Sequence, residues 1–165
     1  CPFITKGKEV GMALLTAAEA LEWAIEIEKN GEAFYRSVAA ETTDQAVKEL
    51  FEDLAVQEQR HCQTFQRMLA GTSDRDLSDY DHDEYLAYLQ AALDSALFGG
   101  PGKGLTLAKQ VQDRTMALYA AMGFEKDTLL FFYNLRDTMN KAHRETISAI
   151  IREENRHLRR LAGML

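Results

Sequence analysis

The pentapeptide EQRHC at residues 58–62 shares its Glu-x-Arg-His pattern with ENRHL at residues 154–158. Each copy lies in a segment whose apolar residues recur at alternating spacings of four and three. This spacing is typical of a helix packed in an antiparallel bundle. In both segments the glutamate, and the histidine three positions after it, fall on the apolar face. The two copies therefore predict two amphipathic helices that carry polar side chains on the faces to be buried.

Two further segments complete a set of four predicted helices. The stretch TAAE at residues 16–19 has the form of a capping box, which marks the start of a helix. Asp44 and Asn140 are suitable N-cap residues for two later helices, and Gly71 is a suitable C-terminal cap. The predicted helices cover about residues 17–40, 45–71, 113–137 and 141–163.

Residues 71–112 separate the second predicted helix from the third. An acidic stretch is followed by an apolar segment around residues 85–98 and then by GGPGKG at 99–104, which we interpret as a turn. This region is expected to be a long crossover that contains one short helix. The expected fold is all-α, a four-helix bundle in a single domain at residues 1–165.

Composition excludes several classes of protein. With 46% hydrophobic and 27% charged residues and only two prolines, the chain fits a soluble, mostly helical protein. A net charge of −7 disfavours a nucleic-acid partner, because binding phosphates requires a basic face. Cys1 and Cys62 are the only cysteines, which excludes a disulfide framework or a Cys-x-x-Cys metal site. No segment has the pattern of a membrane span, so no membrane partner is expected. The two cysteines without Cys-x-x-Cys spacing fit a reducing cytoplasm.

The first and third predicted helices each carry one glutamate on the apolar face. IEKNGEAFY at residues 27–35 contains Glu28 and aligns with FEKDTLLFF at residues 124–132, which contains Glu125. This alignment indicates two similar helix pairs. At about 1.5 Å per residue, the first helix rises about 18 Å beyond Glu28 and the second returns about 21 Å to Glu58. The glutamates of both pairs should therefore lie at one level of the core.

Four glutamates in an apolar core require compensation, because an isolated buried ion is very costly. Two divalent cations would balance four carboxylates, and two imidazoles would complete the coordination. Oxygen and imidazole ligands with open positions favour iron or manganese. The predicted metal ligands are Glu28, Glu58, His61, Glu125, Glu154 and His157. The alternative is that each apolar face is shifted by one residue, which would place these side chains on the surface.

The motif of Glu28, Glu58-x-x-His61, Glu125 and Glu154-x-x-His157 resembles the di-iron site of the ferritin-like superfamily. The Glu28-x6-Tyr35 spacing and LAVQEQRH at residues 54–61 are most similar to rubrerythrins. The resemblance implies a ferritin-like bundle and a centre of two iron ions, with manganese or zinc as substitutes. It also implies a homodimer.

The same resemblance implies an oxidoreductase that reduces hydrogen peroxide or dioxygen. Its electrons would come from a separate donor protein, since the chain lacks the rubredoxin-type site of rubrerythrins. Rubrerythrins also usually carry another glutamate one turn after the third-helix ligand, where this chain has Thr128. Two alternatives stay open: an iron-handling protein, either a ferroxidase or an iron carrier, and a non-catalytic metal-binding helical module.

Tyr35 is the one further candidate near the predicted site. It follows Glu28 by one heptad on the same helix face and is a candidate to hydrogen-bond a ligand carboxylate. Its counterpart on the third helix is Phe132, which has no hydroxyl group. The small side chains of Gly31 and Thr128 are expected to leave room beside the metals for a small oxidant.

Overall fold

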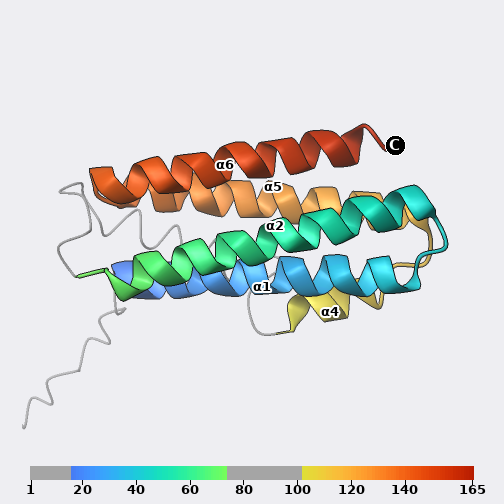
Figure 1. Cartoon of the computed structure of the whole chain (residues 1–165), viewed down its shortest axis with the longest axis horizontal. Coiled ribbons are helices and arrows are strands. Elements are labelled where there is room, and N and C mark those ends of the chain that lie inside the picture. Colours follow the sequence, from blue (N-terminus) through green and yellow to red (C-terminus); the bar gives the residue numbers. More distant parts are fainter. Residues whose placement is uncertain (1–15, 74–101) are drawn as a thin grey trace, which may run out of the picture.

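In the part of the chain that the structure describes, four long helices form a bundle and a short helix lies against its side (Figure 1). The computed structural model describes residues 16–73 and 102–165, and within these ranges the chain contains no strand. Helix α1 packs mainly on α2, and α5 mainly on α6. The predicted all-α fold and four-helix bundle are confirmed. The described helices are α1 (Ala17–Glu41), α2 (Gln45–Ala70), α4 (Lys103–Ala108), α5 (Arg114–Thr138) and α6 (Lys141–Ala162).

Local sequence accounts for where the long helices begin. The Thr16 hydroxyl oxygen accepts a hydrogen bond from the Glu19 amide at 3.1 Å, and the Glu19 carboxylate accepts one from the Thr16 amide at 2.7 Å. These two bonds form the predicted capping box. The side chains of Asp44 and Asn140 accept backbone amides at the starts of α2 and α6 in the same manner. The predicted helix boundaries are correct to within one or two residues.

The crossover differs in one respect from the sequence-based interpretation. The apolar segment around residues 85–98 lies outside the described residues, and the described part of the crossover contains a short helix, α4, near its end. The interpretation of GGPGKG as a turn is wrong for its last two residues, which begin α4. Gly102 precedes them with a φ of 76°, a left-handed conformation that glycine adopts without steric cost.

Helix α4 is held against α1 by a close backbone contact. The Gly104 amide donates a hydrogen bond of 3.1 Å to the side-chain oxygen of Asn30, which is buried. A Cβ atom placed on Gly104 would lie only 1.9 Å from the Asn30 carbonyl oxygen. Only glycine fits this position without moving one of the two helices. The contact ties the end of the crossover to the helix that carries Glu28.

Replacing Gly104 with alanine should destabilise the protein. The added methyl group forces α4 away from Asn30, and overpacking of this kind costs about 1–3 kcal/mol. The expected result is a melting temperature lower by about 2–4 °C for each kcal/mol, measured by circular dichroism. Gly163→Ala is the matched control, because a Cβ atom there would meet backbone oxygens only at an ordinary contact distance of 3.5 Å. Equal melting temperatures for the two variants would contradict the packing role of Gly104.

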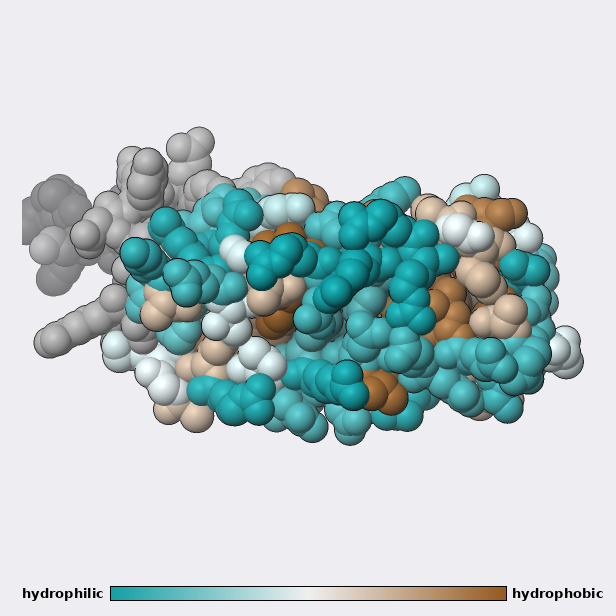
Figure 2. Space-filling view, turned by 45° about the horizontal axis from the view of Figure 1, so that its top comes forward, coloured by the Kyte–Doolittle hydropathy of each residue, from teal (hydrophilic) through white to brown (hydrophobic). Residues whose placement is uncertain are grey.

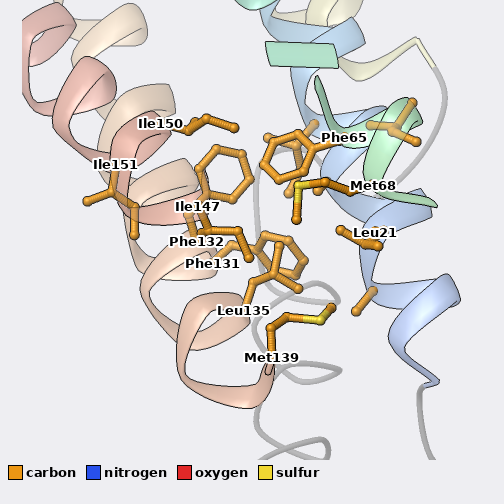
Figure 3. Close-up of a cluster of buried hydrophobic side chains, with 14 of the residues drawn as sticks. Leu21, Phe65, Met68, Phe131, Phe132, Leu135, Met139, Ile147, Ile150 and Ile151 are labelled. Carbon is orange, nitrogen blue, oxygen red and sulfur yellow. The ribbon is translucent and has the colours of Figure 1, made fainter. Parts of the chain in front are cut away.

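The apolar core is divided into two clusters. One lies around the start of α1, the end of α2, the end of α5 and the start of α6, and Figure 3 shows Phe65, Phe132 and Ile150 among its side chains. The other surrounds Phe34, Phe51 and neighbouring residues toward the opposite end of the bundle. On α1, α2 and α6, the glutamates and histidines of the predicted site fall between these clusters in sequence. The polar layer is therefore sealed by apolar packing on both sides.

The outer surface is mainly hydrophilic on the face that Figure 2 shows, with small apolar patches. On α5, the most exposed large apolar side chains are those of Tyr119 and Leu130. Among the other described residues, Leu105 of α4 and Leu165 are also exposed. None of the described helices combines the length and the apolar character needed to cross a membrane.

Candidate metal centre

All six predicted metal ligands meet in the middle of the bundle. Each of the four long helices contributes one glutamate, and all four glutamates have no exposed surface. The two histidines, from α2 and α6, are also buried. The alternative in which the helix faces are shifted, leaving these side chains on the surface, is wrong. The residues are Glu28, Glu58, His61, Glu125, Glu154 and His157.

The six side chains form two overlapping groups of four. In each group, every residue offers one donor atom, and these atoms lie within 4.8 Å of one another. Glu58 and Glu154 belong to both groups, so their two oxygens can face two different cations. The first group adds Glu28 and His61, and the second adds Glu125 and His157. Shared carboxylates of this kind can bridge two metal ions.

Both imidazoles turn Nδ1 toward the carboxylates. His61 Nδ1 lies 2.7 Å from Glu154 Oε1 and 3.6 Å from Glu28 Oε1. His157 Nδ1 lies 2.9 Å from Glu154 Oε2 and 3.2 Å from Glu58 Oε1. The two rings are nearly parallel, with centroids 5.8 Å apart. Glu154 thus stands between the two imidazoles and presents one oxygen to each.

The opposite ring nitrogens are held by two residues that the sequence did not reveal. His61 Nε2 lies 2.8 Å from Glu153 Oε2, and His157 Nε2 lies 3.0 Å from Gln57 Oε1. When Nδ1 binds a cation, Nε2 carries the ring proton and donates it to these oxygens. The only sequence signal for Glu153 and Gln57 is their position, since each immediately precedes a shared glutamate. The contacts themselves join α2 to α6 and so cannot be read from either helix alone.

Tyr35 makes the kind of hydrogen bond that its position predicted. Its hydroxyl donates to Glu125 Oε1 on α5, and both side chains are fully buried. Burial, together with the nearby Glu125 carboxylate, raises the pKa of Tyr35 well above its usual value. The side chain therefore remains a protonated donor at neutral pH. Phe132, its counterpart on α5, is buried in the apolar core.

The donor atoms of the cluster lack ordinary hydrogen bonds. Within the described ranges, both oxygens of the α1, α2 and α6 glutamates have no hydrogen-bond partner, and the same holds for Nδ1 of both histidines. Their mutual distances are short, but their orientations do not meet hydrogen-bond geometry. Buried polar atoms are nearly always satisfied, so this many unsatisfied atoms require an explanation. A pair of cations fits the donor set, because it would satisfy oxygen and imidazole atoms together.

Without cations, protons take over part of the charge compensation. Burial and then the Glu58 charge raise the pKa of Glu28, and burial and then the Glu154 charge raise that of Glu125. Burial alone would lower the pKa of His61, but the Glu28 and Glu154 carboxylates raise it to about 12. The metal-free cluster therefore holds protons on groups that would lose them to a metal ion.

The structure changes the interpretation of Gly31. A Cβ atom on Gly31 would lie 2.9 Å from the Phe124 ring and 3.2 Å from a Glu58 oxygen. Its missing side chain therefore lets the aromatic ring and the carboxylate approach α1, and the expectation of free space beside Gly31 is wrong. Thr128 is fully buried, and its hydroxyl has no hydrogen-bond partner among the described residues.

Comparisons with known proteins agree with this geometry. The family model described as Rubrerythrin matches residues 19–165 of the chain. A 2.30 Å crystal structure of a Thermotoga maritima protein, described as ferritin-like and diiron-carboxylate, is 27% identical in sequence. The similarity covers 92% of this chain and 95% of that one, with a TM-score of 0.65. The comparison with curated proteins found no match.

Proposed function

Because the chain belongs to the rubrerythrin family, we propose that it is a di-iron carboxylate oxidoreductase that reduces hydrogen peroxide or dioxygen. The observation that carries this proposal is the pair of overlapping donor groups, with Glu58 and Glu154 common to both. Two iron ions held there would supply the two electrons that, with two protons, convert hydrogen peroxide into two water molecules. Manganese or zinc could replace iron, because both accept oxygen and imidazole ligands.

The proposed ligand roles follow the two groups. Glu28 and His61 belong to one metal position, and Glu125 and His157 belong to the other. Glu58 and Glu154 are shared. The hydrogen bonds at Nε2 keep both imidazoles turned so that Nδ1 faces the metal positions.

The surrounding residues prepare the site for a small oxidant. The two apolar clusters exclude bulk water from the polar layer, so a large substrate has no place beside the carboxylates. The Tyr35 hydroxyl fixes one oxygen of Glu125. The chain has only two cysteines and lacks a second, cysteine-ligated iron site, so we propose that a separate protein returns the electrons. A cytoplasmic homodimer, without nucleic-acid or membrane partners, completes the proposal.

Thr128 favours a second candidate function. It stands where rubrerythrins usually carry an additional glutamate, and a threonine cannot supply a carboxylate when a metal ion changes its ligands. A protein without that exchange is suited to oxidise ferrous iron as a substrate and to pass it on. The second candidate is therefore an iron-handling protein, a ferroxidase or an iron carrier.

Anaerobic loading with ferrous iron, followed by stopped-flow mixing with either peroxide or dioxygen, distinguishes the candidates. The oxidoreductase is expected to oxidise rapidly with one oxidant, keep its iron through a desalting column, and return to the ferrous state with a chemical reductant over repeated cycles. Oxidation followed by release or accumulation of ferric iron would support the iron-handling protein. Iron that binds but reacts with neither oxidant would leave a non-catalytic metal-binding module.

A further inference from the structure

The two metal positions have equivalent inner ligands but different outer contacts. His61 on α2 reaches Glu153 on α6, and His157 on α6 reaches Gln57 on α2. Both partners immediately precede a shared glutamate, so the two contacts are equivalent in position. They differ in charge, because one imidazole donates to a carboxylate and the other donates to a neutral amide. The near-symmetric bundle therefore carries a built-in difference between its halves.

The Glu153 carboxylate is in direct contact with His61. The Glu153 side chain is 39% exposed, and its Oε2 lies against the outer nitrogen of the His61 ring. Its other oxygen lies 3.4 Å from Arg156 Nη2, but this pair is exposed and therefore weak. The contact at 2.8 Å increases the electron density on the ring and strengthens its Nδ1 as a ligand.

The Gln57 side of the site lacks such a charge next to the ring. The Gln57 amide nitrogen donates to Asp53 Oδ2 at 2.8 Å, so on the Nε2 side of the ring the Asp53 carboxylate is separated from His157 by the amide group. Arg160 Nη1 lies 2.6 Å from the same Asp53 oxygen, in a pair that is also exposed and therefore weak. His157 is therefore the weaker donor of the two imidazoles.

The two glutamates that are not shared also differ in their strength as donors to a cation, in the same direction as the two imidazoles. Glu125, in the His157 group, gives part of its electron density to the hydrogen bond from Tyr35. Neither oxygen of Glu28, in the His61 group, accepts a hydrogen bond from a described residue. Phe132 stands at the position on α5 that is equivalent to Tyr35 and has no hydroxyl to donate. Glu28 and His61 are thus both stronger donors than their counterparts in the His157 group.

We propose that the position held by Glu28 and His61 binds a divalent cation more tightly than the position held by Glu125 and His157. Glu153 and Gln57 are the positioning residues that set this order. The inference rests on the proposed di-metal function and adds a sequence of loading: the first ion enters the His61 position. A chain carrying one ion is therefore loaded in one defined half of the site.

Anaerobic Co²⁺ titration against a competing chelator tests the proposal on full-length protein. His157→Ala keeps the His61 group complete, and His61→Ala keeps the His157 group complete. The first variant is expected to bind Co²⁺ about 10–100-fold more tightly than the second, the range typical of outer hydrogen-bond partners. In the His157→Ala background, Glu153→Gln should weaken binding by a similar factor.

Two matched variants separate an effect on the ligand from an effect on the fold. Glu153→Gln in the His61→Ala background should change Co²⁺ affinity by less than about threefold, because the imidazole it acts on is absent. Gln57→Glu in the same background should tighten binding about tenfold, a gain that a loss of structure cannot produce. Circular dichroism confirms that each variant is folded. If the single-histidine variants do not fold, the wild-type titration should show two steps that Glu153→Gln brings together.

The outcomes separate this inference from the proposed function. Equal Co²⁺ affinities of the two single-histidine variants, or an equal effect of Glu153→Gln in both backgrounds, would overturn the inference while leaving a di-metal site in place. In the wild-type Co²⁺ titration, a single binding step would also overturn the inference. Two steps that Glu153→Gln leaves unchanged would overturn it as well. A wild-type protein that binds no Co²⁺ at all would reject the di-metal function itself.

Discussion

Glu58→Ala is expected to remove both metal ions, whereas Glu28→Ala is expected to remove only one. Glu58 belongs to both donor groups, and Glu28 belongs to the His61 group alone. If each group held a cation, loss of the shared carboxylate would leave both cations short of a ligand and would leave uncompensated charge in a buried site. The measurement is metal content by mass spectrometry after anaerobic loading with ferrous iron and desalting. Wild-type protein should retain two ions per chain.

Glu52→Ala is the matched control for this prediction. Glu52 lies on α2, as Glu58 does, but its side chain is exposed, so its removal should leave the metal content unchanged. Circular dichroism should show that all three variants keep the helical bundle. If Glu58→Ala retained the wild-type metal content, or if the wild type bound no more than one ion per chain, the assignment of the site would be wrong.

The second large effect is metal-dependent stability. Metal ions that bind only the folded protein at about 1,000 times their dissociation constant each stabilise it by about 4 kcal/mol. Two ions contribute about 8 kcal/mol, which corresponds to a rise in melting temperature on the order of 15–30 °C for a chain of this size. The ions stabilise only the folded state, because the unfolded chain has no preformed site. A chelator takes up the free ions and should therefore remove this increase in melting temperature.

This increase in melting temperature should grow with pH. In the metal-free protein the pKa of His61 is raised from 6.5 to about 12, so its stabilising effect is complete below pH 6.5 and is lost as the pH rises. The raised pKa values of Glu28 and Glu125 also lower the stability of the metal-free protein as the pH rises above 4.5. The lowered pKa of Glu154 acts in the opposite direction, but only as the pH falls below 4.5.

Differential scanning fluorimetry between pH 6 and pH 9, with metal and with chelator, checks this prediction. The melting temperature of the metal-free protein should fall across this range. The metal-loaded protein should change less, because bound cations have displaced the protons that these groups would otherwise hold. A melting temperature that responds equally to pH in both states, or that ignores chelator, would contradict a buried metal site.

The helices and the six buried donor residues of the candidate site could be predicted from local patterns. The capping box at Thr16 and the N-cap at Asp44 depend on residues within three or four positions, so they are visible in one dimension. The spacing of Glu58 and His61 along the apolar face predicted that both side chains would be buried. Burial follows from helix periodicity because that face must be removed from water in a bundle.

Other features depended on contacts between distant segments. The space predicted beside Gly31 is filled by Phe124 from α5, and a gap in one helix reveals nothing about the side chain that enters it. The sequence predicts that Gly104 is part of a turn, because glycine often marks turns. Its actual role is to allow the backbones of α4 and α1 to touch. In each case the deciding atom comes from another helix.

Short-range periodicity in the sequence is sufficient to predict which residues form the helices and which glutamates and histidines lie on the buried faces. The packing of the helices is needed to show which of these glutamates are shared between the two donor groups, and which side chains hold the outer nitrogens of His61 and His157. Glu153 and Gln57 act across the interface between α2 and α6. Their roles depend on the relative position of two packed helices, which the pattern along either helix does not contain.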